Sequence, residues 1–420
     1  MQVPTPQLPF VYSEDCLFVN VFAPLRTPPT LLPVIVWIHG GGLQSGMSDN
    51  YNATVLAGAA VEPVVVVTFN YRLNVFGFFF LNESNTSTMN LGIRDQRMAL
   101  QWVQTNIASF GGDSSRVTLM GESAGSFSAF VHMIEKESWP LFDKVVAESA
   151  GPGIWQPSAV AVVTFQKYAR SLGCSDLTCL QGLPAPALVP NYPMAQSPFV
   201  YVWDTRILPH QPQTMIALNM GRPETDVLVG TNAVEANFFS WLFMNYSLTP
   251  PSGAYYESVQ AAQMALYGDK ARAVAAKFYP FDPQNATRNF LNLAAPVIDL
   301  IVSCSSQLAA QSLQKRDDSA TFRYLWTVAP QNYIVCQLGL GATHTVDVPF
   351  FFGTGTVFGF QFTAAETEFA ESTSAIVRHF VTTGSAPWHT NETYVFALDG
   401  SHVSQYEQDC DRWKDVLLAN

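Results

Sequence analysis

A serine between two glycines has the surroundings in this chain that most clearly predict chemistry. Residues 121–125 read Gly-Glu-Ser-Ala-Gly, which matches the pattern G-x-S-x-G. They follow the apolar run Val117–Met120, which favours a strand, and precede Ser126–Ile134, which can form a helix. The backbone of such a tight strand-to-helix turn is strained, so only small residues fit on both sides of the serine. This context predicts that Ser123 is a nucleophile and that the Ala124 N–H points toward a developing oxyanion.

A run of one histidine and three glycines, residues 39–42, directly follows the apolar run Pro33–Ile38. Backbone without side chains lets the N–H groups of Gly41 and Gly42 approach a developing negative charge. Fixed donors at such a place are each worth roughly 3 kcal/mol of barrier. The alternative is a flexible turn with no chemical role. An HGGG-type loop upstream of a serine turn favours the oxyanion role.

A serine hydroxyl needs a histidine to take its proton, and the histidine needs a carboxylate to fix its orientation and tautomer. With the serine in a turn of this kind, the chain order is serine, acid, histidine. His344 lies in a Gly-Ala-Thr-His loop and is the best of seven histidines. Glu235 follows the run Asp226–Val229, and a carboxylate beyond a parallel strand lies at the edge where such sheets hold their sites. For either residue the alternative is a solvated loop side chain.

The other six histidines fit the role less well. Some precede the serine or lie just behind it, one would need an acid between itself and the serine, and the rest suit packing or the C-terminal tail. In chain order they are His39, His132, His210, His379, His389 and His402.

Short β-branched runs alternate with helical patterns along the chain, which is typical of an α/β fold: a mostly parallel sheet with helices on both faces. Continuous Val/Ile runs suit strands buried on both faces. The clearest helix covers Asp95–Phe110, where Ala99, Val103 and Ile107 share one face. No linker divides the chain, so we expect one domain over residues 1–420. The expected strands are Pro33–Ile38, Val64–Phe69, Phe76–Leu81, Val117–Met120, Lys144–Ala147 and Asp226–Val229.

The chain has 420 residues, 48% hydrophobic and 13% charged, with a net charge of −12. This composition supplies a large core and argues against disorder. Because nucleic-acid binding relies on Lys and Arg, the acidic balance argues against it. No apolar run approaches the ~18 residues needed to span a bilayer, and residues 1–10 do not resemble a signal peptide. No Cys/His cluster has metal-ligand spacing, and the predicted chemistry requires no cofactor.

Two features favour a secreted protein. Cys174 and Cys179 flank a four-residue loop and are placed for a local disulfide, which belongs to oxidising compartments. The pairing of the remaining cysteines, Cys16, Cys304, Cys336 and Cys410, does not follow from their spacing. The chain also carries six Asn-x-Ser/Thr glycosylation acceptors, although unused acceptors are the alternative. They are Asn52, Asn82, Asn85, Asn245, Asn285 and Asn391.

Five motifs occur in an order that identifies a family. They are Ser13–Leu17 (SEDCL), Val36–Gly42 (VWIHGGG), Asn70–Leu73 (NYRL), the run from Gly92 to Asp113, and Gly121–Gly125 (GESAG). With them the chain resembles the type-B carboxylesterase/lipase family, the cholinesterase-like branch of the α/β-hydrolases. The resemblance is dense over residues 12–150 and patchy beyond. It implies a serine ester hydrolase that cleaves apolar small-molecule or lipid esters through an acyl-enzyme, without metal or cofactor.

Carried over residue by residue, the resemblance implies a triad, three oxyanion donors and two supporting residues. The triad is Ser123, Glu235 and His344, the donors are Gly41, Gly42 and Ala124, and the supporting residues are Ser149 and Glu122. The pair Cys174–Cys179 resembles a loop disulfide of fungal members.

The chain departs from the family pattern in several places. Val234 and Ala236 replace the Asp and Gly that usually flank the acid, and Asp347 stands where the family generally has Glu. The stretch between nucleophile and acid is compressed. The family's opening segment, which carries the partner of Cys16, is absent, so we expect Cys16 to be unpaired. Two alternatives therefore stand beside the enzyme: a non-catalytic binding or adhesion protein on the same scaffold, and an inactive truncated product.

Overall fold

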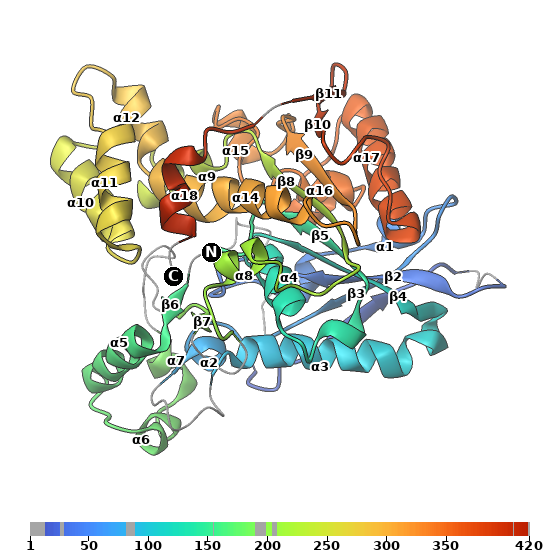
Figure 1. Ribbon diagram of the computed structural model, residues 1–420, viewed down its shortest axis with the longest axis horizontal. Helices are drawn as coiled ribbons and strands as arrows, with labels where there is room; N and C mark the ends of the chain where they lie inside the picture. The colour runs from blue at the N-terminus through green and yellow to red at the C-terminus, as the bar shows by residue number, and fades with distance from the viewer. Residues whose placement is uncertain are drawn as a thin grey trace.

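A nine-stranded sheet runs through the centre of the computed structural model (Figure 1). The structure describes residues 13–25, 29–80, 89–153, 155–189, 199–203, 208–405 and 407–418. Within them the strand order is β1-β3-β2-β4-β5-β8-β9-β10-β11. The strands are β1 (Val19–Phe22), β2 (Leu32–Ile38), β3 (Val65–Phe69), β4 (Gly112–Glu122), β5 (Lys144–Glu148), β8 (Asp226–Asn232), β9 (Thr321–Trp326), β10 (Thr393–Phe396) and β11 (His402–Ser404).

The sheet is parallel from β3 to β10, and only its outer strands run the other way. β1 pairs antiparallel with β3, and β11 pairs antiparallel with β10. The inner pairs, β3–β2–β4–β5–β8–β9–β10, are all parallel. This confirms the prediction of a mostly parallel sheet.

Both faces of the sheet are covered, and β2 is apolar at every position. In β2, Val34, Val36 and Ile38 join the core beneath α3 (Leu91–Asn106) and α4 (Ala124–Ile134). The alternate residues Ile35 and Trp37 join the core on the other face, with α16 (Val348–Phe351) and α17 (Ala364–Thr383). Successive strand side chains point to opposite faces, so one strand contributes to both cores.

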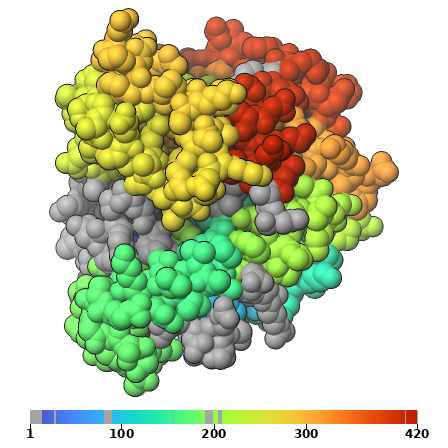
Figure 2. Space-filling view, turned by 60° about the vertical axis from the view of Figure 1, so that its left-hand side comes forward, coloured from blue at the N-terminus to red at the C-terminus, as the bar shows by residue number. Residues whose placement is uncertain are grey.

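Two groups of helices project from one side of this core. Figure 2 shows them as separate masses, green for α5–α7 and yellow for α10–α12. Their bounds are α5 (Ser158–Ser171), α6 (Leu177–Gln181), α7 (Ala185–Leu188), α10 (Gly253–Met264), α11 (Gly268–Phe278) and α12 (Ala286–Asn292). The remaining short elements are α1 (Thr54–Ala57), α2 (Asn74–Phe78), β6 (Gln156–Pro157), β7 (Val202–Trp203), α8 (Pro212–Ala217), α9 (Ala236–Phe243), α13 (Ala295–Ile298), α14 (Cys304–Leu313), α15 (Ile334–Gln337) and α18 (Asp411–Leu417). The single domain over residues 1–420 stays a prediction.

The predicted strand over Phe76–Leu81 is wrong for Phe76–Phe80, and Leu81 lies outside the described residues. Residues Asn74–Phe78 form the short helix α2, and Asn74 enters it with a left-handed φ of 53°. A short apolar run fits a buried helix as well as a buried strand, so periodicity cannot separate the two. The predicted helix Asp95–Phe110 corresponds to α3 followed by a 3₁₀ turn over Ile107–Phe110.

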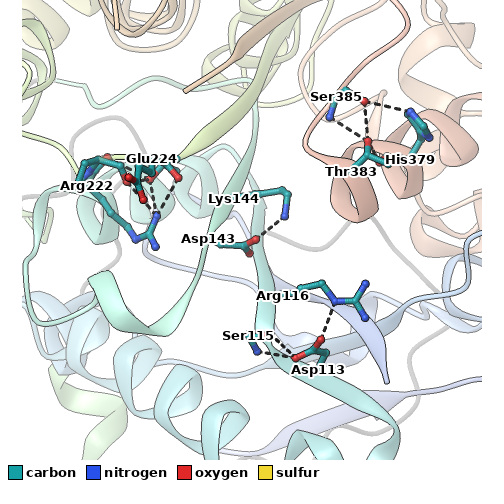
Figure 3. Close-up of polar contacts among 12 residues, drawn as sticks. Asp113, Ser115, Arg116, Asp143, Lys144, Arg222, Glu224, His379, Thr383 and Ser385 are labelled. Carbon is teal, nitrogen blue, oxygen red and sulfur yellow. Dashed lines mark hydrogen bonds and ion pairs between the residues drawn. The ribbon is translucent and has the colours of Figure 1, made fainter. Parts of the chain in front are cut away.

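Ion pairs occupy the amino ends of β4 and β5, the end of the sheet opposite the serine turn (Figure 3). Arg116 Nε lies 2.8 Å from Asp113 Oδ2, and Lys144 pairs with Asp143. These charges lie where β4 and β5 begin, whereas Ser123 follows the last residue of β4. The two ends of the sheet therefore have different roles, and only the carboxyl end carries the candidate site.

Two disulfides lie within the described residues. One joins Cys174 to Cys179, the local pair expected from the spacing. The other joins Cys304 in α14 to Cys410 at the start of α18, across a sequence separation of 106. Cys16 is a free thiol, as expected, and so is Cys336.

One helical stretch in the described residues, Ala286–Leu313, is long and apolar enough to cross a membrane by length and composition. Polar residues interrupt this stretch, so it contains no continuous apolar run of that length. In the structure 78% of its apolar window is buried, as in the core helix of a soluble protein. The stretch comprises α12, α13, a π-helical segment over Asp299–Ser303, and α14.

Candidate active site

Ser123 lies in a strained turn between β4 and α4. Its φ is 56°, in the left-handed region, and its N–H donates to the Glu148 carbonyl at 2.9 Å. A Cβ added at Gly125 would lie 1.8 Å from the Ile38 carbonyl oxygen, and one at Gly121 would lie 2.5 Å from the Gly125 carbonyl carbon. Only glycine fits at either position, which is the steric reason predicted for the motif. Ser123 is half-buried, whereas Ala124 is fully buried.

The glycine loop after β2 packs against this turn. A Cβ at Gly40 would lie 3.1 Å from the Ser123 Cβ, so the loop backbone directly neighbours the nucleophile. Gly41 has a φ of 106°, and a side chain there would collide with the Ser45 carbonyl. Behind the loop, Tyr71 donates its hydroxyl to the His39 carbonyl at 2.8 Å. This contact fixes the loop from its buried side.

Glu235 and His344 lie in direct contact. His344 Nδ1 is 2.7 Å from Glu235 Oε2, and the second carboxylate oxygen, Oε1, accepts the Asn232 N–H at 2.7 Å. Glu235 is 3% exposed and His344 2%. In a neutral ring an Nδ1–H bond to the carboxylate leaves Nε2 as the proton acceptor, which is the tautomer a general base requires.

The other ring nitrogen faces Glu122. His344 Nε2 lies 3.1 Å from Glu122 Oε1, although the angle is outside that of a hydrogen bond. In the part of the chain that the structure describes, no hydrogen bond links His344 Nε2 to Ser123. The structure thus brings Glu235, His344 and Glu122 into contact and leaves the Ser123–His344 hydrogen bond unformed. Catalytic hydrogen bonds are often long before substrate binds.

Buried carboxylates determine the electrostatics of this site. Burial lowers the pKa of His344, but the charges of Glu122 and Glu235 outweigh it and raise the pKa to about 9. Burial raises the pKa of Glu122 to about 8 and that of Asp347 to about 6. Burial also holds the pKa of Glu148 well above its usual range. The surroundings of His344 therefore stabilise its protonated form.

Comparison with protein families matches the chain to the model described as the carboxylesterase family, over residues 1–412. The chain belongs to the carboxylesterase family. Among its relatives is the acetylcholinesterase of Electrophorus electricus, 39% identical over 246 residues, which cover 54% of this chain and 38% of the relative. The acetylcholinesterase of Bungarus fasciatus is 30% identical over 398 residues, or 89% of this chain and 64% of the relative. The chain thus spans less than two thirds of the length of these relatives.

Three other histidines of this carboxylesterase-family chain have partners outside the candidate triad. His132 is fully buried in α4, between Ser138 and Gln96. His379, on α17, lies 2.9 Å from Glu62 and beside Ser385 (Figure 3). His39 stacks on Tyr71 beneath the glycine loop, and burial lowers its pKa to about 4.

Hydrogen bonds join the two loops that carry the acid and the histidine. Val234 N–H donates to the Ala342 carbonyl at 3.1 Å, and Phe238 N–H donates to Thr343 Oγ1 at 2.8 Å. On the far side the Phe239 ring packs 4.8 Å from the His344 ring. The bonded residues lie close in sequence to Glu235 or His344. These hydrogen bonds therefore fix the separation of Glu235 and His344.

A polar network behind Glu235 includes Ser149 and Asp347, which the family resemblance singled out, and Asn232 and Tyr324, which were not predicted from the sequence. The Asn232 side chain donates to Ser149 Oγ at 2.9 Å and to Asp347 Oδ1 at 3.1 Å. Tyr324 donates its hydroxyl to Asp347 Oδ2 at 2.8 Å. Ser149 thus lies two hydrogen bonds from Glu235, with Asn232 between them. The one sequence feature that pointed to Asn232 was its position at the carboxyl end of a strand, where parallel sheets place their functional sites.

Proposed function

We propose that this chain hydrolyses carboxylic esters through an acyl-enzyme on Ser123. The observation that carries the proposal is the 2.7 Å hydrogen bond between His344 Nδ1 and Glu235 Oε2, beside a strained serine turn. Family membership supports the same chemistry. An intact serine, histidine and acid also argues against the alternative of a non-catalytic adhesion protein on this scaffold.

The proposed cycle starts when Ser123 Oγ attacks the ester carbonyl carbon and His344 Nε2 accepts its proton. The tetrahedral intermediate collapses as the imidazolium protonates the leaving alcohol. Water then attacks the acyl-enzyme with the same histidine as base, which releases the carboxylic acid. Glu235 holds the ring tautomer throughout. When it is ionised, the Glu122 carboxylate, whose Oε1 lies 3.1 Å from His344 Nε2, stabilises the imidazolium.

We assign the oxyanion contacts to the backbone N–H groups of Gly41, Gly42 and Ala124. The close approach of the loop to the Ser123 Cβ and the position of Ala124 at the first residue of α4 support this assignment. Side-chain-free backbone lets such donors reach the oxygen, and each is worth roughly 3 kcal/mol of barrier.

The proposed substrates are small esters with apolar groups. The partly buried aromatic residues Phe238 and Phe239 follow the acid in α9, and Phe239 contacts the catalytic histidine. The named relatives are acetylcholinesterases, which act on a short acyl ester. The preference for short or long acyl chains in the substrate then distinguishes an esterase from a lipase.

Hydrolysis of nitrophenyl esters of increasing acyl length tests the proposal. We expect turnover by the wild-type chain, loss of it in Ser123→Ala, and no loss in Ser372→Ala, a control at an exposed serine of α17. Absence of serine-dependent turnover in the folded chain would contradict the proposed ester hydrolysis. It would favour the alternatives of an adhesion protein or an inactive product.

We also propose that the protein is secreted and glycosylated. The disulfides Cys174–Cys179 and Cys304–Cys410 suit an oxidising compartment. Of the six acceptors, Asn52, Asn245, Asn285 and Asn391 are exposed, and Asn82 and Asn85 lie outside the described residues. Secreted protein from a eukaryotic host should lose mass on treatment with peptide N-glycosidase, and an unchanged mass would contradict glycosylation.

A further inference from the structure

Asn232 is the last residue of β8 and contacts the acid through its backbone. Its N–H donates to Glu235 Oε1 at 2.7 Å, while the other oxygen of that carboxylate binds His344. One carboxylate thus joins the backbone of β8 to the imidazole ring. The direction in which Glu235 presents Oε2 therefore depends on where the Asn232 backbone lies.

The Asn232 side chain uses its amide nitrogen for two further contacts. One goes to Ser149 Oγ, directly after β5, and the other to Asp347 Oδ1. An amide nitrogen has two N–H donors, and both have an acceptor here. The residue is 3% exposed, so water does not readily replace these partners.

Asp347 connects the network to the histidine. It follows His344 by three residues and lies at the start of α16. Its second oxygen accepts the Tyr324 hydroxyl at 2.8 Å, so β9 holds it from the other side. A movement of Asp347 would shift the short segment that carries His344.

From these contacts we infer that Asn232 is a positioning residue, which fixes Glu235 through its backbone and His344 through Asp347. The inference rests on the proposed ester hydrolysis. Asn232 sets the separation of acid and base from both sides and touches neither substrate nor the reacting atoms. Misplacement of reacting groups by about 1 Å costs on the order of 100-fold in rate.

Exchanging the donor and the acceptor of the Asn232–Asp347 hydrogen bond tests the inference. Asn232→Asp places an oxygen opposite Asp347 Oδ1 and removes both N–H donors. Asp347→Asn leaves one acceptor oxygen where Asp347 has two, so the side chain no longer accepts from both Asn232 and Tyr324. We expect each single change to lower kcat by on the order of 100-fold with little change in KM. The double variant Asn232→Asp/Asp347→Asn restores a donor and an acceptor with the polarity exchanged and the net charge unchanged. It should recover most of the lost kcat.

The pH profile of kcat/KM gives a second readout. The charged groups acting on His344 are Glu122 from β4, Glu235 after β8 and Asp347 before α16. Glu148 from β5 and Tyr324 from β9 interact with Asp347 in turn. An added carboxylate at position 232 stabilises the imidazolium. The rise of kcat/KM with pH should therefore move to higher pH in Asn232→Asp, and return toward the wild-type position in the exchanged double variant.

Asn289→Ala is a matched control. Asn289 is an equally buried asparagine, 2% exposed, whose side chain bonds the Asp282 backbone at 2.7 and 2.8 Å in the helical region around α12. Asn289→Ala should reduce thermal stability and leave kcat unchanged. A folded Asn232→Ala variant with wild-type kcat would overturn the inference. So would a double variant no better than Asn232→Asp, or an equal kcat loss in Asn289→Ala.

A readout independent of turnover separates this inference from the proposed function. If the wild-type chain shows no Ser123-dependent hydrolysis, the proposed function fails. The position of His344 is then measured by NMR of the histidine-labelled protein, through the Nδ1 proton bonded to Glu235. A displaced or broadened resonance in Asn232→Ala, with no change in Asn289→Ala, supports the positioning role. An unchanged resonance in both overturns it.

Discussion

Glu122 Oε1 lies 3.1 Å from His344 Nε2, on the side of the ring that must accept the serine proton. The residue directly before Ser123, the proposed nucleophile, is therefore in contact with the proposed base. Both side chains are buried, and the carboxylate contributes to raising the pKa of His344 to about 9. The position of this carboxylate links the serine turn to the proton affinity of the histidine.

Glu122→Gln should move the activity profile toward lower pH. A general base must be neutral, so kcat/KM rises as the pH passes the pKa of His344. The substitution removes one of the charges that raise this pKa and keeps the side-chain size. The measurement is kcat/KM for a nitrophenyl ester across pH, compared with wild type. An unchanged or upward-shifted rise would contradict the assigned effect of Glu122.

Glu235→Gln should lower kcat by about 10⁴-fold, the loss seen when a triad acid becomes an amide that favours the wrong histidine tautomer. The amide can still occupy the position between Asn232 and His344, so the fold should survive. Steady-state kinetics with circular dichroism as a folding check measures both. Activity near that of wild type would point to another carboxylate as the acid.

Gly125→Ala should destabilise the fold by about 3 kcal/mol or more, because the new Cβ would lie 1.8 Å from the Ile38 carbonyl oxygen. Gly182→Ala is the matched control. Its Cβ would meet nothing closer than 3.3 Å at an exposed helix end, so it should change stability little. Urea unfolding of both variants gives the two free energies of unfolding. Equal values for the pair would contradict the steric argument.

Removing the Cys304–Cys410 disulfide should cost more stability than removing Cys174–Cys179. The sequence separations are 106 and 5, and a disulfide that closes a longer loop restrains the unfolded chain more strongly. We expect Cys304→Ser/Cys410→Ser to lose about 2 to 5 kcal/mol. Thermal unfolding of the two double variants ranks them, and a larger loss for the short loop would reverse the expectation.

The parts of the site that follow from local sterics could be predicted from the sequence. Gly121 and Gly125 make the serine turn possible, and the apolar runs before Ser123 and Glu235 place both residues at strand ends. The contact between Glu235 and His344 needed the chain order of the family as well, because 109 residues separate them. Whether these residues act as proposed stays a prediction until activity is measured.

The parts that Asn232 and Tyr324 play in this network could not be predicted, because their contacts depend on the register of neighbouring strands. Gly230 pairs with Tyr324, and the missing side chain at Gly230 leaves the space that the tyrosine ring fills. That packing directs the Tyr324 hydroxyl to Asp347. No pattern in one strand reveals which residue of the next strand lies opposite. The error over Phe76–Leu81 has a different cause, since a short apolar run carries no periodicity.

The contact between Gly125 and the Ile38 carbonyl couples the two halves of the reaction centre mechanically. The serine turn and the end of the strand that leads into the glycine loop touch backbone to backbone, so they move as one body. Glu235 follows β8 of the same sheet, whereas His344 lies in a separate loop that meets the serine turn through the Glu122 side chain. Any adjustment that brings His344 Nε2 from Glu122 toward Ser123 therefore falls to the histidine loop, while Ser123 and the glycine loop keep their positions relative to each other.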